Sequence, residues 1–221
     1  MNTCGASALV TGAIGGPGRA FALGLPTRDA RTLYAAARGP KAVTGPGLTP
    51  LPRRITDPAP VPTADERCPA TTLVVDNTRI ARDGSPLSAE YLDGACDQPE
   101  TDLFGPLAMC RASAPVLGKS DSGALVNVLS VLSWHTLPQI GSPKATAWSM
   151  TRSVRESPRA QDPFTIAGHT AFIDTGTATH GGQTKISPAD LAGLADREEA
   201  LTIDVTRQAR STLSRGANHD H

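Results

Sequence analysis

A glycine-rich loop near the N-terminus constrains the fold more than any other feature of this sequence. Ser7–Thr11 is a short apolar run typical of a buried strand, and it leads directly into Gly12–Gly18 (GAIGGPG). Gly18–Leu25 then has helical composition, and Pro26 ends it. A strand, a tight glycine turn and a helix in immediate succession predict the first βα step of an α/β domain.

Further strands and helices alternate along the chain. The other clear strand candidates are short and rich in β-branched or small apolar residues: Thr32–Ala36, Thr71–Val75, Ala124–Leu129 and Phe164–Ala167. Helical spacing occupies Ala89–Leu117, Lys144–Arg155 and Pro188–Leu201. This alternation predicts an α/β fold with one doubly wound parallel sheet and helices on both faces. We expect a single domain over residues 1–215 and a disordered tail at 216–221.

Proline is the one element of composition that conflicts with this pattern. The chain has 19 prolines, against about 11 expected from average usage. Thr49–Ile55 lies where a strand is expected, but Pro50 and Pro52 would interrupt the ladder of an interior strand. Pro62, Pro99 and Pro106 would likewise remove hydrogen bonds from predicted helices.

Charge and cysteine usage exclude several classes of function. The formal net charge is zero, so no excess of basic residues favours a nucleic acid or a membrane surface. The apolar runs are much shorter than a membrane helix, and the N-terminus lacks a signal pattern, so we expect a cytoplasmic protein. The four cysteines form no CxxC pair, which predicts buried or idle thiols and no metal site.

The glycine loop also predicts a ligand. Glycines allow a backbone to approach a pyrophosphate closely, and the following helix presents free N–H groups and a positive dipole end. The spacing resembles the TGxxxGxG loop of the short-chain dehydrogenase/reductase family, with Thr11, Gly12, Gly16 and Gly18 at the motif positions. The resemblance implies a Rossmann-like fold that binds a nicotinamide dinucleotide.

Blocks later in the chain extend this resemblance. They occur in the family's order, and they are Val74–Ile80 (VVDNTRI), Thr101–Gly105 (TDLFG), Asn127–Ser130 (NVLS), Lys144–Ser149 (KATAWS) and His169–Thr175 (HTAFIDT). The resemblance implies that Asn77 and Thr175 also contact the cofactor. It further implies a shortened bacterial member, of a family in which dimers and tetramers are common. The corresponding interface would lie on Thr101–Leu117 and Lys144–Arg155.

The family's catalytic residues are only partly present. By resemblance, Ser130 would hold the substrate oxygen, Lys144 would be the lysine that favours a tyrosine phenolate, and Asp102 occupies the position of an asparagine. The tyrosine itself is missing, because the segment Gly141–Lys144 reads as if a short stretch containing it had been deleted. His135 titrates near neutrality, but its spacing does not place it beside the substrate, and Ser142 is a far weaker acid.

The expected cofactor contacts are altered as well. No acidic residue follows the second strand, and Arg38 there either meets a 2′-phosphate, which favours NADP over NAD, or is an ordinary surface arginine. Pro17 cannot donate a backbone hydrogen bond, and Arg54 replaces an aspartate. Arg79 replaces a small residue and either blocks the site or turns outward. These changes predict NADP binding that is weak or lost.

Two hypotheses follow from the sequence. One is an NADP-linked oxidoreductase of the short-chain dehydrogenase/reductase type that acts on a small carbonyl or alcohol with impaired activity. The other is a catalytically inactive relative that serves as a binding or partner subunit, or an eroded copy. The missing tyrosine favours the hypothesis of an inactive relative. The ordered motifs indicate that the chain descends from the oxidoreductases of this family.

Overall fold

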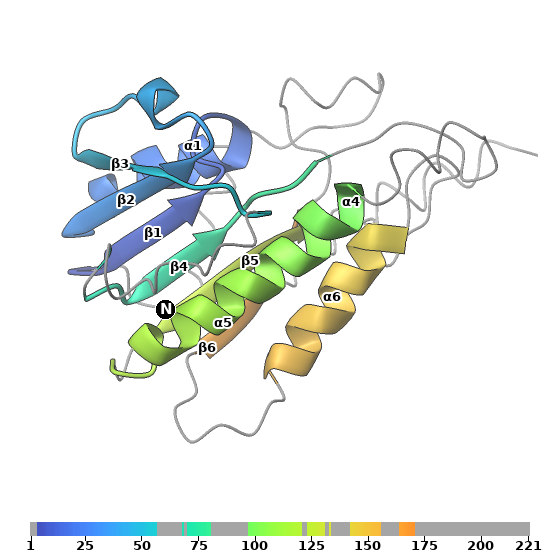
Figure 1. Cartoon of the computed structure of the whole chain (residues 1–221). Coiled ribbons are helices and arrows are strands. Elements are labelled where there is room, and N and C mark those ends of the chain that lie inside the picture. Colours follow the sequence, from blue (N-terminus) through green and yellow to red (C-terminus); the bar gives the residue numbers. More distant parts are fainter. Residues whose placement is uncertain are drawn as a thin grey trace, which may run out of the picture.

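A six-stranded parallel sheet forms the centre of the molecule (Figure 1). The structure is a computed structural model, and it describes residues 4–56, 68, 70–80, 97–120, 123–130, 133, 142–155 and 164–170. The strand order is β3-β2-β1-β4-β5-β6. The strands are β1 (Ser7–Thr11), β2 (Thr32–Ala37), β3 (Leu48–Pro52), β4 (Leu73–Asp76), β5 (Ala124–Ser130) and β6 (Phe164–Thr170). The doubly wound α/β sheet predicted from the sequence is confirmed.

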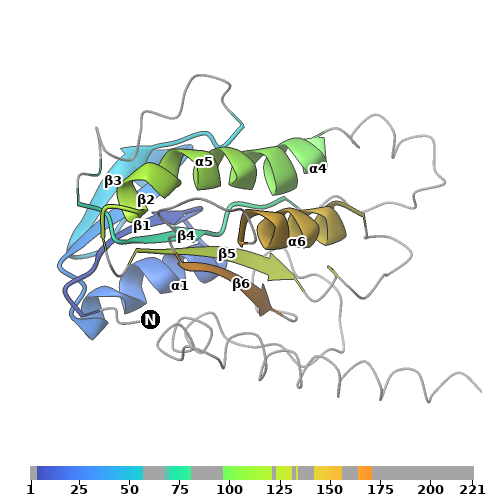
Figure 2. The same ribbon diagram turned by 90° about the horizontal axis from the view of Figure 1, so that it is seen from below.

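Helices cover both faces of the sheet (Figure 2). Helix α1 (Gly16–Gly24) lies on one face, and α5 (Gly105–Leu117) and α6 (Ser142–Arg155) lie on the other. Alternate residues of each strand therefore enter two separate cores. Val10 and Val75 pack with Phe21 of α1, whereas Leu9 and Val74 belong to the cluster of α5.

Strand β3 shows how the sheet accommodates two prolines. Pro50 and Pro52 lie within β3 and pair with Ala35 and Ala37 of β2. Both prolines are exposed, because β3 is at the edge of the sheet and one side of its backbone needs no ladder partner. The predicted conflict with an interior ladder therefore does not arise.

The segment predicted as one helix over Ala89–Leu117 is divided. Its described part begins with the short α4 (Asp97–Pro99), continues as a π-helical turn at Glu100–Phe104, and becomes α5 at Gly105. The Gly105 N–H bonds the Glu100 carbonyl, and Pro106 falls in the first turn of α5, where its missing N–H is tolerated. Pro99 and Pro106 thus interrupt regular α-helix without ending the helical path.

Several predicted features lie outside the described residues. They are Pro62, Cys96, the helix predicted at Pro188–Leu201 and the tail at 216–221. Where the structure describes the chain, no helix is long and apolar enough to cross a membrane. Within the same residues, no group of three or more His, Cys, Asp or Glu side chains could hold a metal ion. Cys68 and Cys110 are buried, and Cys4 is exposed.

Candidate active site

The carboxyl ends of β1 and β4 lie at the point where the strand order of the sheet reverses. β1 is flanked by β2 and β4, and the connections from these two strands run to opposite sides. In open α/β sheets, such a switch point is where ligands bind. Two of the side chains that line this point are Thr11 at the end of β1 and Asp76 at the end of β4.

Thr11 and Asp76 join the two strand ends. The Thr11 hydroxyl donates to Asp76 Oδ1 over 2.5 Å. The same hydroxyl oxygen accepts the N–H groups of Asn77 and Thr78 at 3.0 and 3.2 Å. Asp76 Oδ1 also accepts the Thr78 N–H at 3.3 Å. One threonine hydroxyl therefore fixes the path of the chain as it leaves β4.

Burial raises the pKa of Asp76 to about 6, and the hydrogen bonds from Thr11 and Thr78 and the charge of Arg53 only partly oppose that rise. Its second oxygen, Oδ2, is buried and has no hydrogen-bond partner among the described residues. The carboxyl group is therefore half protonated near pH 6.

The glycine loop packs against Asn77 without room for side chains at two positions. A Cβ added to Gly18 would lie 2.3 Å from the Gly12 carbonyl oxygen and 2.6 Å from Asn77 Nδ2. Gly12 has a φ of +65°, a left-handed conformation that glycine adopts without strain. Gly12 and Gly18 are thus required for the shape of the loop itself, and Asn77 lies beside it with a buried Oδ1 that has no partner among the described residues.

The N-terminus of α1 is open to an anion. Gly15 is its N-cap, no side chain caps the helix, and the first turn contains no acidic residue. A Cβ added to Gly15 would meet nothing within 4 Å. Pro17 lies in the first turn, so it removes one donor but leaves the helix intact. The Ala13 N–H bonds the Ala36 carbonyl at 3.2 Å and ties the loop to the end of β2.

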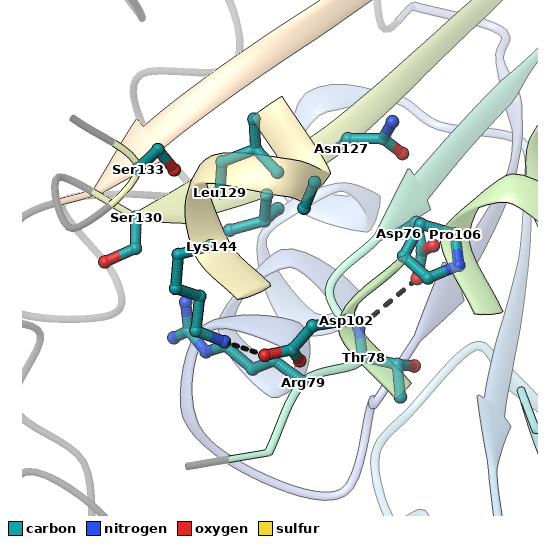
Figure 3. A pocket seen from close by; sticks show the side chains of 12 residues that line it. Asp76, Thr78, Arg79, Asp102, Pro106, Asn127, Leu129, Ser130, Ser133 and Lys144 are labelled. Carbon is teal, nitrogen blue, oxygen red and sulfur yellow. Dashed lines mark hydrogen bonds and ion pairs between the residues drawn. The ribbon is translucent and has the colours of Figure 1, made fainter. Parts of the chain in front are cut away.

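A hollow beside the end of β5 brings together Ser130, Asp102 and Lys144, which were predicted from the sequence (Figure 3). Lys144 Nζ forms an ion pair with Asp102 Oδ2 and donates to the Ile80 carbonyl at 3.3 Å. Asp102 Oδ1 accepts the Ile80 N–H at 3.1 Å. Burial lowers the pKa of Lys144 and the charge of Arg79 lowers it further, whereas Asp102 raises it.

Arg79 lines the same hollow as Lys144 and Asp102. Of the two orientations left open by the sequence, its side chain therefore takes the inward one. Burial lowers the pKa of Arg79 from its ordinary value, and the Asp102 carboxylate opposes this change.

The structure resembles solved structures over its whole length, although no protein-family model and no curated protein matches the chain. A short-chain dehydrogenase from Burkholderia cenocepacia, solved in complex with NADP, is 29% identical with a TM-score of 0.85, over 100% of this chain and 95% of the other. The comparison supports the resemblance of this chain to the short-chain dehydrogenase/reductase family. A family member from Burkholderia phymatum, solved in complex with NAD, is 18% identical with a TM-score of 0.74, over 98% and 96% of the two chains.

A third similar structure is a short-chain dehydrogenase from Streptomyces avermitilis. It is 19% identical, with a TM-score of 0.76 over 99% of this chain and 95% of the other. At this identity the likeness concerns the fold alone.

The family's motif positions fall in two groups. Thr11, Gly12, Gly16, Gly18 and Asn77 surround the switch point, and Gly16 has a φ of +52°. Ser130, Asp102 and Lys144 line the hollow. Two exposed arginines lie beyond the strand ends, Arg38 after β2 and Arg54 after β3. The assigned roles of these residues remain predictions.

Some predicted residues cannot be placed. Thr175 and His135 lie outside the described residues, as does Gly141, and nothing is described of the Ser142 side chain. Of the two tyrosines, Tyr34 lies within β2, away from the hollow, and Tyr91 is outside the described residues.

Sequence reasoning missed the role of Asp76 as the partner of Thr11. The available signal was the position of both residues at the carboxyl ends of predicted strands. It could be used only if β1 and β4 were known to be neighbours.

Sequence reasoning also missed that Asn127, which lines the hollow, links two elements by a hydrogen bond. Its Nδ2 donates to Thr151 Oγ1 at 3.0 Å, and that hydroxyl donates to the Ala147 carbonyl at 2.8 Å. The pair joins β5 to α6, which carries Lys144. Nearby Cys110 is no candidate nucleophile, because burial raises the pKa of its thiol to about 12.

Proposed function

We propose that this protein is an NADP-dependent oxidoreductase that transfers hydride between the nicotinamide and a small carbonyl or alcohol compound. The observation that carries the proposal is the arrangement at the switch point, where the Thr11–Asp76 hydrogen bond joins the ends of β1 and β4 beside a glycine loop and an uncapped helix N-terminus. The similar structure from Burkholderia cenocepacia contains NADP, which supports the same cofactor here.

The residues of the glycine loop and of the N-terminus of α1 fit the phosphate end of a dinucleotide, whereas the inward Arg79 occupies a position where the family has a small residue. Gly12, Gly16 and Gly18 give the loop its shape, and the open N-terminus of α1 suits a pyrophosphate. Asn77 lies beside the loop, and its buried Oδ1 has no hydrogen-bond partner among the described residues. Arg38 lies exposed beyond β2, suited to a 2′-phosphate, which favours NADP over NAD. By resemblance, Thr175 would complete the nicotinamide end.

The hollow supplies the groups for the substrate. When bound, the cofactor supplies the hydride. Ser130 would hold the substrate oxygen by a hydrogen bond, and Lys144 would provide positive charge near it. The Asp102 carboxylate offsets that charge, so Lys144 stabilises a neighbouring phenolate or alkoxide less than a lysine beside an asparagine would. Together with the absent tyrosine, this pairing predicts slow turnover.

The same pairing favours the second candidate, an inactive relative that binds a ligand or partner. An ion pair of Lys144 with Asp102 and an inward Arg79 occupy the part of the hollow where the family performs proton transfer. The predicted cytoplasmic location and homo-oligomeric state remain predictions under either candidate.

Titration of the purified protein with NADPH and with NADH, followed by nicotinamide fluorescence, tests the proposal. We expect NADPH to bind more tightly than NADH, and Arg38→Gln to remove most of that difference. Arg31→Gln, which changes an exposed arginine before the start of β2, is the matched control. If neither NADPH nor NADH binds, the proposed function is refuted. Binding without turnover against a panel of aldehydes and ketones would favour the inactive relative.

A further inference from the structure

The hollow contains two carboxyl groups and two cations, but only one ion pair is found among these described side chains. Asp76, Arg79, Asp102 and Lys144 all line it. Lys144 forms an ion pair with Asp102 Oδ2, and the other oxygen of Asp102, Oδ1, accepts the Ile80 N–H. Both carboxylate oxygens of Asp102 therefore have hydrogen-bond partners, and the charge of Asp102 acts on Arg79 without a hydrogen bond between them.

Asp76 does not serve as the counter-ion of Arg79 either. Its Oδ1 is occupied by Thr11 and Thr78, and the cation whose charge acts on it is Arg53. In the part of the chain that the structure describes, no ion pair or hydrogen bond holds the Arg79 guanidinium. A cation that burial has partly removed from water is stabilised by an anion that enters the same hollow.

The remaining lining suits a small organic molecule. Pro106, Leu129 and Ala147 give an apolar wall, and Ser130 adds a hydroxyl. No residue of the glycine loop lines the hollow. The helix terminus suited to the cofactor's phosphates is thus separate from Arg79. A guanidinium binds a carboxylate through two parallel hydrogen bonds, which fixes the orientation of the molecule that carries it.

We propose that Arg79 binds the carboxylate of the substrate, and that the substrate is a small carbonyl compound such as a 2-oxo acid. This proposal rests on the proposed oxidoreductase function. Arg79 would hold the acid group while Ser130 faces the carbonyl oxygen, with the short apolar chain against Leu129 and Ala147.

Isothermal titration calorimetry with 2-oxobutyrate and its neutral amide, 2-oxobutanamide, tests the assignment. Both compounds are titrated into the full chain, with and without saturating NADPH. We expect the acid to bind more tightly than the amide. Arg79→Gln should weaken binding of the acid by about 10- to 100-fold, the loss of a charge-assisted hydrogen bond pair, and leave the amide unchanged. Arg79→Lys should lose less, and Arg31→Gln, at an exposed arginine before β2, should behave like the unchanged protein.

Equal binding of acid and amide would overturn the proposal, as would a preference for the acid that survives Arg79→Gln. Weakened NADPH binding in Arg79→Gln with unchanged acid binding would assign Arg79 to a cofactor phosphate, and would also overturn it. Circular dichroism of each variant establishes that it is folded. The acid is also titrated without NADPH, so failure of the nucleotide to bind refutes only the proposed function. The comparison of acid with amide tests the role of Arg79 separately.

Discussion

The Thr11 hydroxyl and the Asp76 carboxyl form a buried hydrogen bond that joins the carboxyl ends of β1 and β4. The hydroxyl also accepts two backbone N–H groups of the segment that leaves β4. This buried hydrogen bond therefore fixes the two strand ends beside which a dinucleotide would lie. Of its two residues, Asp76 titrates.

Stability should fall as the pH rises from 3.8 to about 6. The folded pKa of Asp76 is about 6 and its ordinary value is 3.8, so folding favours the protonated carboxyl. Its contribution is complete below pH 3.8 and is lost as the pH rises through about 6. The gap between the two values corresponds to about 3 kcal/mol of free energy of unfolding.

Asp76→Asn should remove this pH dependence and be more stable than the unchanged protein at about pH 7.5. Urea unfolding at about pH 4 and about pH 7.5 measures both effects. Asp29→Asn, at an exposed aspartate with φ of +60° that asparagine also tolerates, is the control. A variant at Asp76 whose stability still falls between these pH values would show that another group is responsible.

Two glycines of the loop should differ in how alanine affects the stability of the protein. Gly18→Ala places a Cβ against the Gly12 carbonyl and Asn77, so the loop must shift. We expect it to lose about 1–3 kcal/mol of unfolding free energy and most NADPH binding. Gly15 has an extended φ of −157° and open space around its Cβ position. Gly15→Ala should therefore keep its stability and lose only NADPH affinity.

Thermal unfolding and NADPH titration of both variants separate loop packing from ligand contact. If Gly15→Ala binds NADPH normally, the phosphates do not approach the N-terminus of α1. If Gly18→Ala is as stable as the unchanged protein, the loop is not as closely packed as the structure shows.

Much of the fold could be predicted from local patterns. Ser7–Thr11 was predicted with the bounds it has, since a buried parallel strand is a continuous apolar run. Strand β3 could not be assigned, because whether Pro50 and Pro52 are tolerated depends on which strand lies at the edge. That is a property of the whole sheet, and no local pattern contains it.

The site was predictable only where the residues match a motif. Lys144 and Asp102 were assigned separately by resemblance, and their ion pair depends on how α6 packs against the π-helical turn that carries Asp102. The inward direction of Arg79 and the raised pKa of Asp76 both result from burial. Burial is set by tertiary packing, so spacing alone could not predict either.

The ion pair of Lys144 with Asp102 should show strong coupling. The two side chains are 11% and 3% exposed, so removal of one partner leaves a buried charge, which costs about 3–5 kcal/mol. We expect Lys144→Met to be destabilised by this amount, and Asp102→Asn by less, since its amide oxygen still accepts the Ile80 N–H. A double-mutant cycle by urea unfolding measures the coupling. Additive single effects would contradict a direct pair.

Pro115→Ala should stabilise the protein. Pro115 lies inside α5 and is exposed, so its alanine replacement regains a helical hydrogen bond without loss of core packing. The gain should reach at most about 3 kcal/mol. Pro50→Ala on edge strand β3 regains no comparable bond and should lose about 0.4–1 kcal/mol through the freer unfolded chain. Urea unfolding compares the two, and equal effects would contradict this reasoning.

Restoring the tyrosine should reveal how much of the catalytic machinery survives. Ile140 stands four residues before Lys144 in the sequence, so Ile140→Tyr recreates the Tyr-x-x-x-Lys spacing of the family. A positioned proton donor contributes about 10²–10⁴-fold to rate, and we expect a gain in NADPH consumption toward the lower end of that range, because Asp102 offsets the charge of Lys144. Ile140→Phe supplies the same ring without the hydroxyl and should gain nothing. Combining Ile140→Tyr with Asp102→Asn should raise the rate further if that offset limits the phenolate. If neither tyrosine variant turns over while NADPH still binds, the geometry of the hollow, and not the missing proton donor, limits catalysis.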